Sequence, residues 1–329
     1  MKPKIWHLIG DRSLGGCNLV VEEIITSPLK KEFDFSVFKI EEAKQELKIY
    51  RPEAIVFHYP CAWKYLYDLI QLKQRTKLYI YDHHYCEYFE KQQVKHLFRF
   101  RLMLRISYAI ADRILSVSEG QKKWLLKHKL VEPNKVQVLT PASSIENLLE
   151  ISPKKSQSPL ILGAYGRFAP QKGFDLLLEA FQLLPQEKYQ LYLGGYGQEE
   201  AKIKQIARNL PNVKLLGKIT DVPAFLASCD AVIIPSRWEP WGLVCLEAKA
   251  TGKPVIATAV DGLSEQIDSS WGILVPPNDK QQLAAAIASL QDRNLLALGN
   301  AARASVVNAK DKFLNNWAEI SRDGFQKTT

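Results

Sequence analysis

The sequence predicts an α/β protein with two Rossmann-like domains facing each other across a cleft. Short β-branched or aromatic runs alternate with helix-like segments, which is the pattern of a parallel sheet covered by helices. This alternation restarts after "SPKKSQSP", residues 152–159, a polar stretch typical of a linker between domains. The length of 329 residues also exceeds what one hydrophobic core usually holds and favours two domains of about 150 residues each.

The first domain is predicted over residues 1–150 and has six strand-like runs. The expected strands are 4–9, 36–40, 54–58, 77–81, 113–117 and 135–139. The expected helices between them include 17–26, 41–49, 62–74 and 119–129.

The second domain is predicted over residues 151–305 and repeats the same architecture. The expected strands are 160–166, 189–195, 213–218, 231–236, 254–258 and 272–275. The expected helices are 173–184, 199–209, 222–228, 243–251 and 280–291. Apolar residues spaced along 300–323 predict a terminal helix pair, and we expect the tail 306–329 to pack back on the first domain.

Composition limits the classes of protein to which this chain can belong. The apolar run at residues 5–9 is interrupted by His7 and is too short for a signal peptide, and no stretch reaches the ~18 apolar residues of a membrane span. The five cysteines are odd in number and show no C-x-x-C spacing, which argues against disulfides and against a zinc site. We expect a cytoplasmic protein, either free or peripheral at a membrane, without metal or cofactor.

A loop with two cations follows the first strand of the second domain. Arg167 and Lys172 leave the strand end together in "GRFAPQKG", residues 166–173. Ligands of open α/β sheets bind at the carboxyl ends of strands, and the amides at a helix N-terminus add positive charge. The loop therefore predicts a phosphate site, with an ordinary solvated loop as the alternative. Because the sequence contains no D-x-D motif, these cations rather than a bridging metal would neutralise a diphosphate.

Two carboxylates lie in "PSRWEPWGLVCLEAKATGKPVIAT", residues 235–258, among mostly apolar neighbours. Glu239 lies on the loop after a predicted strand. Glu247 lies on an otherwise apolar face of the following helix, where an acid needs partners, and a ribose diol would satisfy both of its oxygens. The amides from Gly242 to Val244 begin this helix and could face an anion. The alternatives are a plain loop acid and a helix glutamate paired with lysine.

The first domain offers weaker signals at two strand ends. The pair Gly15–Gly16 in "DRSLGGCN" precedes a predicted helix but lacks the G-x-G-x-x-G spacing. His83 and His84 in "YDHHYCE" can donate hydrogen bonds or exchange protons near neutral pH, or they are loop histidines bonded to backbone. Adjacent histidines point in different directions and no partner motif such as H-E-x-x-H occurs, so we expect no metal site.

Residues 91–111 contain no acid and predict one basic helix. On a helical projection its cations share one arc with Phe98 and Leu102, and an apolar face lies opposite. The cations are Lys91, Lys95, Arg99, Arg101 and Arg105, and the opposite residues are Leu97, Phe100, Leu104, Tyr108 and Ala111. The stretch 91–105 therefore suits an anionic membrane surface or a lipid diphosphate, with a solvated basic helix as the alternative. No nucleic-acid-binding motif accompanies the charge.

Taken together, these motifs resemble the retaining nucleotide-sugar glycosyltransferases of family four. The segment 235–258 is similar to their E-x7-E segment, and "GRFAPQKG" is similar to their diphosphate-binding loop. Further similarities are "ADRILSVSEGQKKWL" at 111–125, "LLGKITDVPAFLASCD" at 215–230 and "VDGLSEQI" at 260–267. The resemblance implies the GT-B arrangement of two Rossmann-like domains, with the donor held mainly by the second.

The resemblance also implies roles for individual residues. It implies that Arg167 and Lys172 bind the donor diphosphate. Glu247 would bind the ribose and Glu239 the hydroxyls of the donor sugar. Main-chain contacts are implied for Gly242, Leu243 and Val244 with the sugar or distal phosphate, and for Lys218 and Ile219 with the base.

In the first domain, Gly16 would approach the phosphates, and the family's histidine near the donor sugar matches His83 or, alternatively, His84. Two departures concern this domain: the usual Pro-Asn-Gly-like turn before the linker reads "TPASS" at 140–144, and the domain is short for the family. The acceptor is therefore no closer defined than a glycan or lipid-linked hydroxyl.

The implied activity is transfer of a hexose from a nucleotide diphosphate sugar with retention at the anomeric carbon. Same-face attack would let the departing diphosphate accept the acceptor's proton. One alternative is a nucleotide-sugar epimerase on the same fold, which needs no acceptor. The other is a non-catalytic partner that binds nucleotide sugar or membrane and supports an active homologue.

Overall fold

The computed structural model describes residues 2–10, 15–152 and 157–325. The chain divides into two compact units, residues 1–143 with 309–329 and residues 144–308, close to the boundaries expected from sequence. Half of the predicted linker 152–159, residues 153–156, and the first four residues of "DRSLGGCN" lie outside the described residues. Each unit contains a six-stranded sheet whose paired strands are parallel, as the α/β prediction requires.

Unit 1 orders its strands β2-β1-β3-β4-β5-β6. The strands are β1 (Lys4–Leu8), β2 (Asp34–Phe38), β3 (Ala54–Phe57), β4 (Lys77–Asp82), β5 (Arg113–Ser116) and β6 (Val136–Val138). Its helices are α1 (Gly16–Thr26), α2 (Ile40–Glu46), α3 (Leu66–Lys73), α4 (Glu87–Gln93), α5 (Leu97–Ile110) and α6 (Glu119–Lys127), with short 3₁₀ turns at Pro28–Lys31, Trp63–Tyr65 and Pro133–Lys135. All six expected strands are present.

Alternate residues of the unit 1 strands face opposite sides of the sheet, as the two-residue period of a strand requires. Trp6, Ile55 and Leu78 pack into the core formed with α2, α3, α5 and α6. The other face, which includes Ile5 and Val56, packs against the last helix, α15 (Ala309–Phe325).

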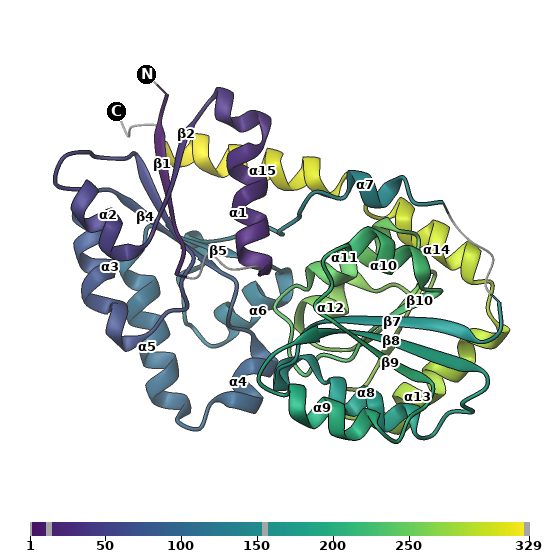
Figure 1. Ribbon diagram of the computed structural model, residues 1–329. Helices are drawn as coiled ribbons and strands as arrows, with labels where there is room; N and C mark the ends of the chain where they lie inside the picture. Colours follow the sequence, from purple (N-terminus) through teal and green to yellow (C-terminus); the bar gives the residue numbers. More distant parts are fainter. Residues whose placement is uncertain (1, 11–14, 153–156, 326–329) are drawn as a thin grey trace. The chain divides into compact units, whose positions relative to one another are not determined.

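Helix α15 belongs to unit 1 although it follows unit 2 in the chain (Figure 1). Its Trp317 is 2% exposed and makes ring contacts with Phe33, Phe35 and His7. The two helices of the tail therefore divide: α14 (Leu295–Ala304) lies in unit 2 and α15 in unit 1, rather than forming one pair.

Unit 2 orders its strands β12-β11-β10-β7-β8-β9. They are β7 (Leu160–Arg167), β8 (Tyr189–Tyr196), β9 (Val213–Gly217), β10 (Ala231–Ile234), β11 (Val255–Thr258) and β12 (Gly272–Val275). The helices are α7 (Glu146–Leu149), α8 (Phe174–Phe181), α9 (Glu200–Ala207), α10 (Val222–Ser228), α11 (Leu243–Ala250), α12 (Asp261–Gln266), α13 (Lys280–Ala288) and α14, with 3₁₀ turns at Pro170–Lys172 and Ser289–Asp292.

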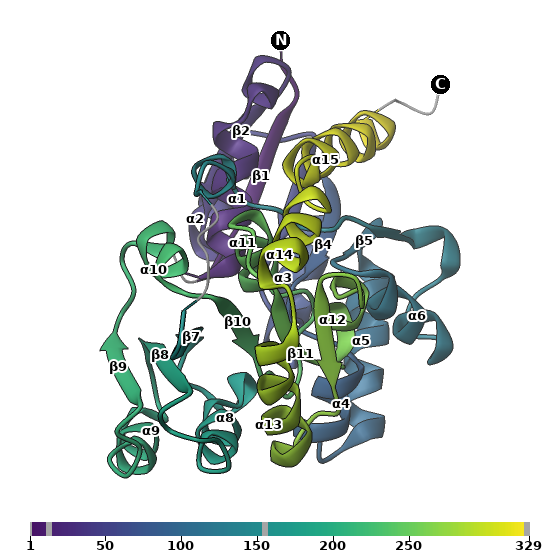
Figure 2. The ribbon, with the colours of Figure 1, turned by 90° about the vertical axis from the view of Figure 1, so that its right-hand side faces the viewer.

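The helices of unit 2 cover both faces of its sheet. Helices α8, α9 and α13 lie on one face, and α10 and α11 lie on the other (Figures 1 and 2). The core between the sheet and the first group is built from leucine, isoleucine and phenylalanine side chains. Short α12 was not expected from sequence, because "DGLSEQ" has no apolar period long enough to indicate a helix.

The predicted basic helix 91–111 is wrong as one element, because the chain leaves helical geometry at Val94 and divides into α4 and α5. Lys91 pairs with Glu87 on α4 at 3.0 Å, and Arg101 binds both carboxylate oxygens of Glu90. Arg105 donates to main-chain carbonyls at the end of α6. Much of the predicted cationic arc is therefore engaged within unit 1.

Only part of the predicted apolar face of residues 91–111 is buried. Leu104, Tyr108 and Ala111 are buried, but Leu97 is 43% exposed beside Phe98, which is 77% exposed. Within the described part of the chain, no helix is both long and apolar enough to cross a membrane.

Candidate active site

The switch point of the unit 2 sheet lies between β7 and β10. Chain order runs outward from β7 through β8 to β9 and then returns to β10 on the opposite side. At such a point the loops leaving two neighbouring strands diverge and leave room for a ligand at the carboxyl ends. The two loops here are 168–173 after β7 and 235–242 after β10, which carry the two motifs singled out by sequence.

Lys172 and Glu239 meet at this switch point. The Lys172 ammonium donates to Oε2 of Glu239, and the Ser236 hydroxyl donates to the same oxygen at 3.1 Å. Glu239 is 7% exposed, so these partners replace the water that would otherwise solvate its carboxylate. The turn before α8 requires Gly173, whose φ is +63° and whose side-chain position would collide with the carbonyl oxygen of Pro235.

Arg237, which sequence reasoning missed, joins the two loops. Its guanidinium binds both oxygens of Asp175, at 2.9 and 3.0 Å, and donates to the carbonyl of Pro170 at 2.8 Å. Its backbone N–H donates to the carbonyl of Gln171 at 2.7 Å. Burial raises the pKa of Asp175, but hydrogen bonds from Arg237 and Lys202 outweigh burial and lower the pKa to about 2. Arg237 therefore holds the segment that presents Lys172.

Gly242 starts α11 with φ of +97°. A side chain there would lie 3.0 Å from Cγ of Glu239 and 3.1 Å from Cδ2 of Leu263, so the position favours glycine for space as well as conformation. Gln266 donates to the carbonyls of Trp241 and Gly242 at 2.6 and 3.3 Å and fixes the turn. The amides of Leu243 and Val244 open the helix and have no intrahelical partner, whereas that of Cys245 donates to the carbonyl of Gly242 at 3.0 Å.

Glu247 lies one turn into α11 and accepts a hydrogen bond from the Tyr165 hydroxyl. Removal from water raises the pKa of Glu247 to about 7, although the Tyr165 bond and the Lys172 charge act in the opposite direction. Lys172 thus acts electrostatically on Glu247 while it pairs with Glu239. The sequence identified Glu247, but its tyrosine partner comes from β7 and had no local signal.

The remaining predicted donor residues of unit 2 lie at the same edge of the sheet. Arg167 ends β7 and is exposed, and within the described residues no hydrogen bond or ion pair engages its guanidinium. Lys218 extends over the Tyr196 ring at 5.7 Å. The Ile219 side chain packs on Gly194, where any side chain would collide with it. Arg167 thus ends β7, and Lys218 and Ile219 directly follow β9.

In unit 1, the predicted residues lie at the carboxyl edge of the first sheet. Gly16 begins α1, and the two histidines follow β4. The buried Asp82 carboxylate shapes this loop by accepting from the amides of His84 and Tyr85 at 2.9 and 3.2 Å. His84 contacts the carbonyl of His58 through Nε2 at 3.0 Å.

His83 does not fit the expectation of a proton-exchanging group. Burial, followed by the neighbouring His84, lowers the pKa of His83 to about 3, so the ring is neutral at pH 7. It can donate or accept one hydrogen bond, but it carries no exchangeable charge near neutrality.

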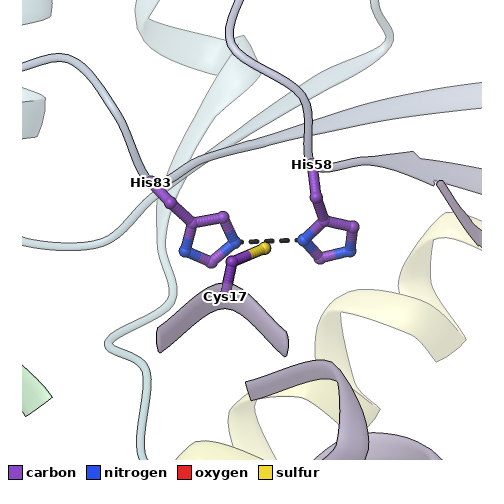
Figure 3. Close-up of side chains that lie close together, drawn as sticks. All are labelled: Cys17, His58 and His83. Atoms are coloured by element: carbon purple, nitrogen blue, oxygen red, sulfur yellow. Dashed lines mark hydrogen bonds between the residues drawn. The ribbon is translucent and has the colours of Figure 1, made fainter. Parts of the chain in front are cut away.

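His58, which sequence reasoning missed, lies between His83 and His7. Its Nδ1 is 3.0 Å from Nε2 of His83, and its Nε2 is 2.9 Å from Nδ1 of His7. The Cys17 thiol lies close to the first of these contacts (Figure 3). The argument against metal binding, that the histidines lack partners, therefore fails. The position of His58 directly after a strand was the signal that could have found it.

Both halves of the chain match family models. Residues 145–308 match the glycosyl transferases group 1, and residues 10–143 match glycosyltransferase family 4. These matches give the class of protein, a glycosyltransferase, and the two six-stranded parallel sheets agree with the GT-B fold of solved structures. The chain belongs to the family 4 glycosyltransferases.

Two curated relatives share less than a third of their residues with this chain in the matched regions. An uncharacterized glycosyltransferase of Methanocaldococcus jannaschii is 30% identical over 60% of this chain and 54% of that protein. A D-inositol 3-phosphate glycosyltransferase of Geodermatophilus obscurus is 30% identical over 58% of this chain and 48% of that protein. The chain thus matches about half the length of these curated relatives.

Solved structures resemble nearly the whole chain. The sucrose-phosphate synthase of Thermosynechococcus elongatus has a TM-score of 0.84 at 21% identity and covers 99% of both chains. HepE of Anabaena, solved with UDP, has a TM-score of 0.78 at 19% identity and covers 98% of this chain and 100% of that one. At these identities the similarity establishes the fold.

Proposed function

We propose that the chain transfers a hexose from a nucleotide diphosphate sugar to an acceptor hydroxyl, with retention at the anomeric carbon. The observation that carries this proposal is the ion pair of Lys172 and Glu239 at the switch point of unit 2, where open α/β sheets bind ligands. The charge of the same lysine also acts to lower the pKa of Glu247. Family membership supports the reaction class.

Each group has a separate task in this reaction. Arg167 and Lys172 bind the diphosphate and, with the first amides of α11, stabilise the charge that grows on it as the glycosidic bond breaks. Glu239 accepts hydrogen bonds from hydroxyls of the donor sugar. Glu247 accepts from the ribose hydroxyls, and the main chain of Lys218 and Ile219 contacts the base.

Donor binding would exchange one partner of Lys172 for another. In the structure the ammonium pairs with Glu239. When a diphosphate arrives, it offers the ammonium more negative charge, and the sugar hydroxyls offer Glu239 new donors. No bridging metal is needed for the diphosphate, because its charge is met by two cations and a helix N-terminus.

In unit 1, Gly16 would allow the start of α1 to approach the phosphates, and neutral His83, or alternatively His84, would donate a hydrogen bond to the donor sugar. In the retaining reaction the acceptor hydroxyl attacks from the face that the diphosphate leaves. The departing diphosphate then accepts the acceptor's proton, so no protein base is required.

The first experiment is a thermal-shift screen of nucleotides and nucleotide sugars, because a ligand that binds only the folded chain raises its stability. UDP-hexoses come first, since HepE was solved with UDP and with UDP-glucose. We expect one base to raise the Tm with and without a chelator. No shift with any common nucleotide sugar would contradict the proposal.

Product analysis then separates the proposed reaction from its alternatives. With donor alone, an epimerase changes the sugar, whereas a transferase needs an acceptor. With lipid-linked and glycan acceptors, NMR of the product reports whether the anomeric configuration of the donor is retained. A chain that binds donor but never turns it over would be a non-catalytic partner.

We also propose that the start of α5 contacts an anionic membrane. Phe98 and Leu97 are 77% and 43% exposed, and Arg99 lies over the ring of Trp63, itself 40% exposed. Exposed apolar side chains next to cations are typical of interfacial binding. Phe98→Asp should reduce co-sedimentation with anionic vesicles, whereas Leu183→Asp, at a 53% exposed position in unit 2, should not. Equal binding to zwitterionic vesicles would contradict the electrostatic part.

A further inference from the structure

Cys17, His58 and His83 lie together at the carboxyl edge of the unit 1 sheet. Cys17 is in the first turn of α1, and the histidines directly follow β3 and β4. The order β2-β1-β3 places the switch point of this sheet between β1 and β3, the strands that lead into Cys17 and His58. The fold therefore brings a thiol and two imidazoles to its customary ligand position.

The three side chains converge closely enough to share one ion. One ligand atom from each lies within 4.8 Å of the other two. His58 Nδ1 and His83 Nε2 face each other at 3.0 Å, and Figure 3 shows the sulfur of Cys17 beside the line that joins them. A tetrahedral ion with bonds of about 2.0–2.1 Å holds two nitrogens roughly 3.3 Å apart. The histidines would need to separate by only a few tenths of an ångström.

We propose that Cys17, His58 and His83 bind a zinc ion. Thiolate and imidazole ligands favour Zn²⁺ over Mg²⁺ or Ca²⁺, which prefer oxygen. Three protein ligands leave the fourth position of a tetrahedral ion to water. The nearby Asp82 is not a further ligand, because its carboxylate accepts from the Tyr108 hydroxyl at 2.5 Å and from two loop amides.

The surroundings of His58 match those of a metal-binding histidine. A histidine that binds a metal through one nitrogen usually donates a hydrogen bond from the other, which fixes its orientation. The second nitrogen of His58 faces Nδ1 of His7 at 2.9 Å, and His7 is 0% exposed and stacked on Trp317. His7 is thus placed to accept from His58 and hold its Nδ1 toward the ion.

Access and proton balance are also consistent with binding. His58 is buried, whereas Cys17 and His83 are half-buried, which leaves the ion an approach from solvent. On binding, the Cys17 thiol releases its proton to solvent and its sulfur forms the bond to zinc. The proton between the two imidazoles moves to the outer nitrogen of its own ring, so each histidine stays neutral and binds through a lone pair.

Cobalt titration of the full chain tests the proposal, because Co²⁺ adopts the same geometry and absorbs visible light. We expect one equivalent to produce four-coordinate visible bands and a thiolate-to-cobalt charge-transfer band, both removed by Zn²⁺. Zn²⁺ should also raise the Tm. The measurement uses neither donor nor acceptor. Failure to bind zinc and failure to transfer a sugar are therefore separate results, although His83 is also proposed to contact the donor sugar.

Variants assign the site. Cys17→Ser changes one atom at a half-buried position and should abolish the charge-transfer band and lower zinc affinity at least 100-fold. His58→Gln and His83→Gln should lower affinity similarly, and His7→Gln should lower it about 10-fold. His96→Gln, at an exposed position, is the matched control and should bind as wild type does.

Two results would overturn the proposal: no stoichiometric cobalt spectrum in the wild-type chain, or a charge-transfer band that persists in folded Cys17→Ser. The second result would assign the thiolate to another cysteine. Circular dichroism establishes that each variant is folded. If a histidine variant unfolds, the Cys17→Ser spectrum and the zinc-dependent Tm decide the outcome.

Discussion

Lys172 on the loop after β7 and Glu239 on the loop after β10 form an ion pair at the switch point of the second sheet. Their side chains are 19% and 9% exposed, so most of the water that would solvate the two charges is excluded. Each residue was predicted to bind a different part of the donor. The structure shows that the two side chains also pair with each other.

The ion pair predicts that removing one partner costs more than removing both. Lys172→Met leaves the buried Glu239 carboxylate with only neutral partners, and we expect it to lower the free energy of unfolding by about 1–3 kcal/mol. Adding Glu239→Gln should recover at least half of that loss. Urea unfolding of the wild type, both single variants and the double variant measures the coupling. Additive losses would show that the pair contributes nothing.

Arg167 predicts a loss of activity without a loss of stability. It is exposed at the end of β7, and its proposed partner is the donor diphosphate. Arg167→Ala should lower kcat about 100-fold, in the range for removal of one charge-stabilising group, and should leave the Tm within about 2 °C. Arg293→Ala, at another exposed arginine of unit 2, is the control. Wild-type kcat in Arg167→Ala would remove this residue from the proposed mechanism.

The raised pKa of Glu247 predicts that this carboxylate lowers the stability of the folded chain at high pH, although it contributes to donor binding. Because its folded pKa of about 7 exceeds the ordinary 4.5, its contribution to stability is full below pH 4.5 and is lost as the pH rises through 7. Glu247→Gln should therefore match the wild type near pH 5 and exceed it by about 1–2 kcal/mol at pH 8. The variant should bind donor at least 10-fold more weakly, measured by calorimetry. Equal stability differences at both pH values would contradict the assignment.

Arg237 predicts an effect on the neighbouring loop rather than direct contact with the donor. Arg237→Ala leaves Asp175 without its bidentate partner and frees the 3₁₀ turn that carries Lys172. We expect the free energy of unfolding at pH 7 to fall by about 2–3 kcal/mol. Because the Asp175 pKa is lowered to about 2, the stabilisation by this pair is present above pH 3.8 and disappears as the pH falls through 2.

Two measurements check that prediction. In Arg237→Ala, the free energy of unfolding should fall less steeply as the pH is lowered toward 2. Arg237→Lys should restore part of the stability at pH 7 but not the bidentate contact. Donor affinity, measured well below the Tm so that the variant is fully folded, reports whether Lys172 has moved from its binding position. The same pH dependence in wild type and variant below pH 4 would show that Arg237 does not set the ionisation of Asp175.

The strands were predictable because each carries its own signal. Short runs of β-branched and aromatic residues need only their neighbours in sequence to indicate a strand, and all six in each unit occur. The break at Val94 was not predictable from the periodicity of 91–111. Arg101 contacts Glu90 because the chain turns between α4 and α5, and Glu90 lies just outside that segment. Absence of acids within a segment says nothing about acids just outside it.

The sequence by itself determined the doubly repeated α/β plan, the two unit 2 loops at the carboxyl ends of strands, and the cations and acids on them. Those features are local: a glycine, a cation or an acid at a strand end. Only the tertiary structure decided which of them meet, because strand order is set by packing of residues far apart in the chain. It paired Lys172 with Glu239, joined Tyr165 to Glu247, and placed Cys17 beside His58 and His83.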